Sequence, residues 1–220
     1  MTSPNIPAGQ RYGSSDESVG DWVLVHKREL LWALLALAVI VGGFWFYERS
    51  QSLKEQRAES AYFQARQSAA AGNLPLAVSD LKKVVARYEG TRAGTQAALS
   101  LAQSLYDQKK FKEGIDALKQ VEAKAPDDFR ASIHVLEAAG FEELKDFTAA
   151  AEQFKLAALA TSFPVDKAKY QAGAARDYMA AGKTDQAKAI WTELAKDESS
   201  LESAEARVRL GELTARPMKT

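Results

Sequence analysis

Four segments of the chain share a pattern that recurs every 36 or 37 residues. Their sequences are GNLPLAVSDL, KKFKEGIDAL, KDFTAAAEQF and GKTDQAKAIW, which start at Gly72, Lys109, Lys145 and Gly182. Each has a small residue at its sixth position and a large apolar residue four positions later. The two columns are Ala77, Gly114, Ala150 and Ala187, then Leu81, Leu118, Phe154 and Trp191. A supersecondary unit repeated at this interval indicates stacked units that bury a continuous core.

Each repeat is expected to be a pair of antiparallel helices. The small residue lets the two helices approach closely, and the large residue inserts into the neighbouring repeat. Gly72 and Gly182 suit the turn between the two helices, where the backbone becomes left-handed, and Lys109 and Lys145 take the same place in the middle repeats. The pattern therefore predicts an all-α solenoid of about four helix pairs plus a capping helix.

The positions of these helices follow from the periodic segments and from the prolines between them. The predicted pairs are about 50–71 with 75–88, 92–108 with 112–124, 127–144 with 148–161, and 165–181 with 184–196, followed by a capping helix near 200–215.

An uncharged stretch of eighteen residues precedes the repeats. Residues 30–47 read LLWALLALAVIVGGFWFY and would span about 27 Å as a helix, close to the thickness of the bilayer hydrocarbon core. Trp32, Trp45 and Tyr47 lie near its ends, where amphipathic rings favour the membrane interface. These features predict a retained transmembrane helix. A cleaved signal peptide and a buried core helix are the alternatives, and the segment GGFWFYERS is a poor cleavage site.

The sequence divides into four parts around this stretch. Residues 1–21 are small and polar and are expected to be a disordered tail, and residues 22–29 form a juxtamembrane segment. Lys27 and Arg28 in this segment lie just before the apolar run. This basic pair predicts a cytoplasmic N-terminus and an extracytoplasmic repeat domain over residues 48–216. The first repeat helix is expected to follow the span without a flexible linker, which would hold the repeats close to the bilayer.

Composition argues against several other classes of protein. The 29 basic and 29 acidic residues balance, so a nucleic-acid partner is not expected. The sequence contains no Cys and only two His, and no catalytic constellation, phosphate loop or metal-ligand spacing can be assembled. The adjacent carboxylates Glu142 and Glu143 do not face each other on a helix and are expected to be solvated. We therefore expect no enzyme, cofactor, metal or small-molecule substrate.

The repeats resemble the tetratricopeptide repeat, in which a small residue on the second helix is followed four positions later by a large one. They depart from that family in their longer period and in lacking its first-helix Trp.

The whole layout is similar to the YfgM family of ancillary subunits of the bacterial SecYEG translocon, over roughly residues 22–215. The stretches that carry the resemblance are the span ending in GGFWFY, then AESAYFQARQSAAAGN, GTQAALSLAQSLYDQKKFKEGIDAL and GAARDYMAAGKTDQAKAIW. The resemblance implies a single-pass protein of the bacterial inner membrane with a periplasmic repeat domain. It also implies partners in a SecYEG-like translocon and a PpiD-like membrane chaperone, and a role near newly exported chains.

The first helices of successive pairs are expected to line a concave groove that binds a peptide or a helix. The predicted groove residues are mostly aromatic or charged: Tyr62, Arg66, Gln103, Tyr106, Glu142, Lys169, Arg176 and Met179. The sequence thus predicts a membrane-anchored protein-interaction scaffold. It leaves open a translocon-bound chaperone adaptor and, alternatively, a structural or assembly subunit of another integral membrane complex, whether respiratory, photosynthetic or of the envelope.

Overall fold

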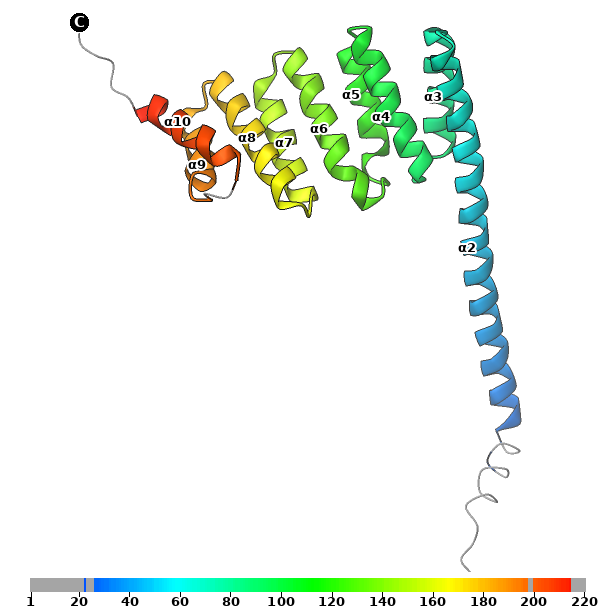
Figure 1. Cartoon of the computed structure of the whole chain (residues 1–220). Coiled ribbons are helices and arrows are strands. Elements are labelled where there is room, and N and C mark those ends of the chain that lie inside the picture. Colours follow the sequence, from blue (N-terminus) through cyan, green and yellow to red (C-terminus); the bar gives the residue numbers. More distant parts are fainter. Residues whose placement is uncertain (1–21, 23–25, 198–199, 215–220) are drawn as a thin grey trace, which may run out of the picture. The chain divides into compact units, whose positions relative to one another are not determined.

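The computed structural model of the chain describes residue 22, residues 26–197 and residues 200–214 (Figure 1). The predicted tail over residues 1–21 lies outside the described residues. The chain divides into two compact units, residues 1–52 (unit 1) and residues 53–220 (unit 2). In the described part all regular secondary structure is helical, which confirms the all-α prediction.

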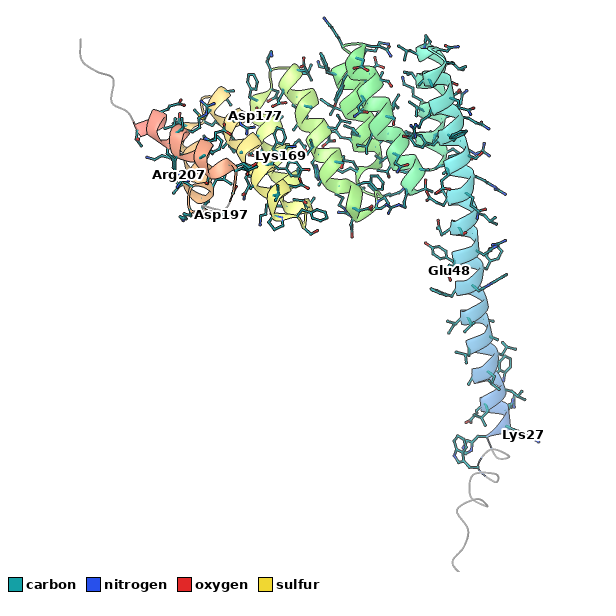
Figure 2. All side chains as sticks on the ribbon, viewed as in Figure 1. Lys27, Glu48, Lys169, Asp177, Asp197 and Arg207 are labelled. Atoms are coloured by element: carbon teal, nitrogen blue, oxygen red, sulfur yellow. The ribbon has the colours of Figure 1, made fainter. Side chains whose placement is uncertain are left out.

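Unit 1 holds the apolar stretch of the longest helix, α2 (Lys27–Ala70). By length and composition, α2 is the one helix in the described ranges that could cross a membrane. Every residue from Leu31 to Tyr47 is exposed, so no other described part of unit 1 covers the apolar side chains. Figure 2 shows Lys27 and Glu48 on α2 at the two limits of this stretch.

Unit 2 is an array of antiparallel helices in chain order (Figure 1). Residues 53–70 of α2 are followed by α3 (Leu74–Arg87), α4 (Arg92–Asp107), α5 (Phe111–Glu122), α6 (Asp127–Glu143), α7 (Phe147–Ala160), α8 (Pro164–Ala180), α9 (Thr184–Leu194) and α10 (Glu202–Thr214). The bounds of α3 to α10 agree with the predicted bounds to within two residues. The predicted solenoid of four pairs and a capping helix is therefore confirmed.

The two sequence columns lie in the core as expected. Ala77, Ala150 and Ala187 are buried, as small residues are where two helices of a pair approach closely. Most of the large residues are buried as well, whereas Phe154 is half-buried and its ring lies against Gly173 of α8. The buried side chains form two clusters, one contributed by α2 to α6 and one by α7 to α10. This division fits a repeat array, in which each repeat packs only against its neighbours.

The two ends of unit 2 differ in the segments that form them. Turns within pairs, at residues 71–73, 108–110, 144–146 and 181–183, form one end, which we call the turn end. Segments that join successive pairs, at residues 88–91, 123–126, 161–163, 195–197 and 200–201, form the opposite end, which we call the connection end (Figure 1).

All four turns have the same backbone geometry. Gly72 and Gly182 have φ of 78° and 73°, and Lys109 and Lys145 have φ of 61° and 62°. In each turn the next amide donates to a carbonyl five residues earlier, as from Lys110 N to Leu105 O at 2.8 Å. This is the Schellman closure of a helix C-terminus, and it places a left-handed residue at the position that glycine favours.

Replacing Lys109 or Lys145 by glycine is expected to stabilise the fold by about 0.5–1 kcal/mol each, because a lysine at positive φ carries a steric cost that glycine avoids. Thermal unfolding of the full chain in detergent, followed by circular dichroism, measures the effect. The control Lys188→Gly, at an exposed site in the middle of α9, should instead destabilise by about 1 kcal/mol. Equal destabilisation at all three sites would contradict the geometry of the turns.

Candidate interaction surface

Side-chain contacts join the first helix of each pair to the first helix of the next. The Tyr62 hydroxyl of α2 lies 2.9 Å from the Ser100 Oγ of α4. One repeat further on, the Tyr106 hydroxyl of α4 donates to the backbone carbonyl of Leu136 in α6 at 3.0 Å. The two tyrosines thus play equivalent roles and hold successive first helices side by side.

The ring of Tyr106 fits between two glycines. A Cβ at Gly114 would lie 2.3 Å from the ring, and a Cβ at Gly140 would lie 2.3 Å from the Tyr106 oxygen. Only glycine at both positions leaves room for the Tyr106 ring to extend from α4 to α6. Burial, together with the negative charge of Glu137, raises the pKa of Tyr106, so its hydroxyl stays protonated and remains a hydrogen-bond donor.

Charged side chains make the contacts between the later helices of the array. Arg176 of α8 makes a bidentate pair with Glu205 of α10, with both nitrogen–oxygen distances 3.0 Å. Asp177 of α8 is buried, its Oδ2 has no hydrogen-bond partner among the described residues, and the nearby Glu142 carboxyl of α6 helps to raise its pKa. Glu142 is half-buried beside the Asp177 carboxyl, which corrects the expectation that it is solvated, whereas Glu143 is exposed as expected. Asp177 lies in the last turn of α8, near the turn end of the array (Figure 2).

The remaining predicted groove residues have different surroundings. Arg66, Gln103 and Lys169 are exposed on first helices, and the Arg66 guanidinium lies 5.9 Å from the ring centroid of Tyr62. Met179 is turned toward the second helix of its pair, where its sulfur accepts a hydrogen bond from the Trp191 indole at 3.3 Å. The predicted set thus separates into side chains that link first helices, exposed side chains and one packing residue.

Burial of Asp177, and then the negative charge of Glu142, raise the pKa of Asp177 from its ordinary value of 3.8 to about 7. Between pH 3.8 and about pH 7, Asp177 is therefore protonated in the native state and ionised in the unfolded chain. The stability that this proton contributes is present in full at low pH and is lost as pH rises from about 4 to about 7.

Replacing Asp177 by asparagine is expected to remove this loss, because the amide is neutral and can donate to the Glu142 carboxylate. At pH 8 the variant should be more stable than the wild type by about 1–3 kcal/mol, and at pH 4 it should not be. Thermal unfolding as a function of pH measures both values. Asp116→Asn, at an exposed carboxylate on α5, is the matched control. Destabilisation of Asp177→Asn at pH 8 would contradict the account.

A second buried polar group lies on α6. His134 Nδ1 is 2.9 Å from the Gln153 amide oxygen and 3.6 Å from Glu137 Oε2, and Glu137 is fully buried. The nearby carboxyl group of Glu137 raises the pKa of His134 despite the opposing effect of burial. These contacts link α6 to α7, so His134 is a packing residue. Among the described residues, no group of three or more His, Asp or Glu is arranged to hold a metal ion.

The structure also shows a hollow that sequence patterns do not indicate. It has a volume of about 340 Å³, lies among α3, α4 and α5, and is lined by Val85, Leu101 and Leu105. Lys82 and Glu113, which also line it, form an ion pair of 3.6 Å. None of the predicted groove residues lines this hollow.

Stacked helix pairs with left-handed turns and linked first helices define the class of α-solenoid repeat proteins. The chain belongs to the family described as tetratricopeptide repeat-like domain, whose model matches residues 21–215. This match confirms the resemblance to tetratricopeptide repeats. Folds of this kind typically serve as non-enzymatic scaffolds for protein interaction.

Two solved structures support the fold. The nearly identical TPR-like repeats of a Podosopora anserina kinesin light chain superpose with a TM-score of 0.53 at 17% identity, over 72% of this chain and 86% of that one. A variant of the same repeats gives the same TM-score of 0.53 at 19% identity, over 72% and 85% of the two chains. A thermophilic TPR protein of Thermus thermophilus matches with a TM-score of 0.44 at 20% identity, over 81% and 96% of the two chains. No curated protein sequence matches the chain.

Proposed function

We propose that this protein is a membrane-anchored scaffold that binds other proteins beside a secretory translocon. In this role it is an ancillary translocon subunit and an adaptor for newly exported chains or for a membrane-anchored chaperone. The observation that carries the proposal is an exposed, uncharged apolar stretch in the same chain as a tetratricopeptide-like array.

The membrane anchor is supported by the exposure of α2. An apolar helix that packed into a soluble core would be covered by other helices, whereas residues 31–47 are exposed along their whole length. A helix of this length matches the hydrocarbon core of a bilayer, in which the exposed side chains would be favourably solvated. Trp32, Trp45 and Tyr47 are exposed near its ends, as interfacial residues are.

Protein binding is supported by the first helices of the array. Their mutual contacts leave Arg66, Gln103 and Lys169 exposed beside the linking side chains. Long polar side chains beside half-buried aromatic rings suit a peptide or a helix as ligand. We call this surface the first-helix groove.

Association with a translocon is supported by the resemblance to the YfgM family, which extends over the span and three stretches of the array. Lys27 and Arg28 precede the span and favour a cytoplasmic N-terminus, which would place the array on the periplasmic side of a bacterial inner membrane. Exported chains and a PpiD-like chaperone would be its neighbours there.

Purification of the full chain from its own membranes in mild detergent tests the proposal. Translocon subunits or a membrane-anchored chaperone should copurify, and the charge reversal Arg66→Glu with Lys169→Glu should reduce their recovery about tenfold or more. Lys112→Glu with Lys188→Glu, at exposed positions on second helices, is the matched control and should leave recovery unchanged. Recovery of a respiratory, photosynthetic or envelope complex instead would assign the protein to that complex, and recovery of no membrane protein would refute the scaffold.

A further inference from the structure

The four most exposed large apolar side chains of unit 2, among the residues that the structure describes, all lie at the connection end. They are Leu201, Leu159, Val165 and Phe163, which are 87%, 78%, 70% and 68% exposed. Exposed apolar side chains that stand singly are common, whereas four gathered at one end of a domain indicate a surface that something covers.

These side chains come from two neighbouring connections. Leu159 lies in the last turn of α7, Phe163 in the connection to α8, and Val165 in the first turn of α8. Val165 and Leu201 line one hollow of about 150 Å³, together with Pro164. The hollow is also lined by Asp197 and Glu202, so its rim is partly acidic. Phe163 adjoins Pro164 in the chain, and Leu159 lies at the same connection. We call the four apolar side chains and Pro164 the apolar patch.

Local hydrogen bonds fix the backbone at Phe163. The Phe163 amide donates to Thr161 Oγ1 at 3.2 Å, and the Phe163 carbonyl accepts from the Lys167 amide at 3.0 Å. Pro164 begins α8 and fixes the backbone at its first turn. The backbone of Phe163 is therefore fixed as part of the start of α8, and its side chain is exposed there.

The connection end is also the end at which the chain enters unit 2. The Lys54 ammonium donates to the Glu89 carbonyl at 2.8 Å, and the Glu55 carboxylate accepts from the amides of Arg92 and Ala93 at 3.0 and 2.9 Å. These contacts place the first residues of unit 2 beside the connection between α3 and α4. Residues 48–52 are all that separates unit 2 from the apolar stretch in the sequence.

The connections near this entry point are polar, in contrast to the apolar patch. Glu89 pairs with Lys124 at 2.8 Å, and Arg92 pairs with Asp128, with one nitrogen–oxygen distance of 3.1 Å. Charged side chains that pair with one another remain hydrated beside a bilayer. The apolar patch lies two repeats further along the same end, so it would form a second point of contact away from the anchor.

We infer that the apolar patch inserts into the interface of the lipid bilayer that holds the span, an inference that rests on the anchor in the proposed function. Phenylalanine, leucine and valine side chains leave water favourably at the boundary between headgroups and acyl chains. So small a patch would bind a membrane only weakly in a protein without an anchor. The span holds the patch near the bilayer, so its binding becomes an intramolecular step at a high effective concentration. The second contact would restrict how the array swings about its anchor and would hold the first-helix groove at a fixed angle to the membrane.

The absence of native cysteine allows the position of the patch to be measured. Ser162→Cys, an exposed site beside Phe163, carries an environment-sensitive fluorophore in the full chain reconstituted into nanodiscs. Nitroxide groups on the lipid acyl chains should quench this label roughly twofold or more, because it would lie at the depth of the first acyl carbons. Thr184→Cys, at the turn end of the same helix pair, should not be quenched.

Two further labelled variants separate this inference from the anchor itself. Phe163→Ser with Val165→Ser, in the Ser162→Cys background, should abolish the quenching, since both substituted side chains are exposed and the fold does not need them. Ile40→Cys reports on the span and should be strongly quenched.

Quenching at residue 40 without quenching at residue 162 would overturn the inference and leave the anchor standing. No quenching at either site would overturn the anchor and the inference together. A label at residue 162 that is shielded from an aqueous quencher but not reached by the lipid quencher would show that protein covers the patch, which also overturns the inference.

Discussion

Replacing Trp191 by alanine is expected to cost about 3–5 kcal/mol and to unfold the C-terminal part of the array, because it leaves a large cavity in the core. Trp191 is fully buried, and its indole donates to the Met179 sulfur at 3.3 Å. It belongs to the cluster formed by α7 to α10, which is separate from the cluster of α2 to α6. The loss should therefore stay in the second cluster, because repeats stabilise only their neighbours.

Hydrogen exchange followed by mass spectrometry of peptides measures this effect. Protection should fall in α8, α9 and α10 and remain in α4 and α5. The matched control, Phe163→Ala, replaces an exposed ring and should change stability by less than about 0.5 kcal/mol. An equal loss of protection throughout the array would show that it unfolds as one cooperative unit and would contradict the division into two clusters.

Introducing arginine at both Val39 and Val41 is expected to release the protein from membranes. An arginine near the centre of a transmembrane helix costs about 2.5–3.5 kcal/mol on the insertion scale, so two cost about 6 kcal/mol, or roughly 10⁴-fold in the insertion equilibrium. Both residues lie near the middle of the uncharged stretch and are exposed. The effect is large because the hydrocarbon core contains no group that could pair with either charge.

Alkaline extraction of membranes separates the outcomes. The wild type should remain in the pellet and the double arginine variant should move to the supernatant. Ser60→Arg with Gln67→Arg adds the same charge at exposed positions of α2 within unit 2 and should behave as the wild type. A wild-type protein that extracts like a soluble protein would refute the anchor, as would a double arginine variant that stays in the pellet.

The helix bounds were predictable because the signals that end each helix recur. Gly72 and Gly182 identified the outer turns, and the constant spacing then transferred the same turn to Lys109 and Lys145, which adopt positive φ although neither is glycine. At both lysines the repeat period predicted the left-handed turn correctly, although lysine disfavours positive φ. The capping helix was predictable for the same reason, since an array of this kind needs a last helix to cover its open end.

The contacts between first helices were harder to predict, and that of Tyr106 depends on packing from three helices. Tyr106 reaches Leu136 only because Gly114 and Gly140 leave room for its ring, and the small-residue column alone did not show which side chain fills that space. Glu142 and Asp177 were missed for a related reason. Their separation of 35 residues is close to the repeat period, so a search for polar pairs one repeat apart would have found them.

The apolar patch shows a different limit of the sequence. Leu159, Phe163 and Val165 stand around a helix end, where apolar residues usually pack inward, and the pattern of the sequence does not tell a buried from an exposed side chain there. The Thr161 hydrogen bond and Pro164 fix the backbone at Phe163 and Val165, whose side chains are exposed. Only the folded connection reveals it.

The central claim is that the first-helix groove binds a partner at the membrane, and photo-crosslinking in intact membranes tests it most directly. A photoreactive residue is placed at Gln103 or Lys169 in the groove, and at Lys112 or Lys188 on second helices; all four sites are exposed. We predict that both groove positions crosslink to translocon subunits, a membrane-anchored chaperone or exported chains, and that the second-helix positions do not. Adducts from the second helices alone, or no membrane or exported partner from any of the four positions, would contradict it.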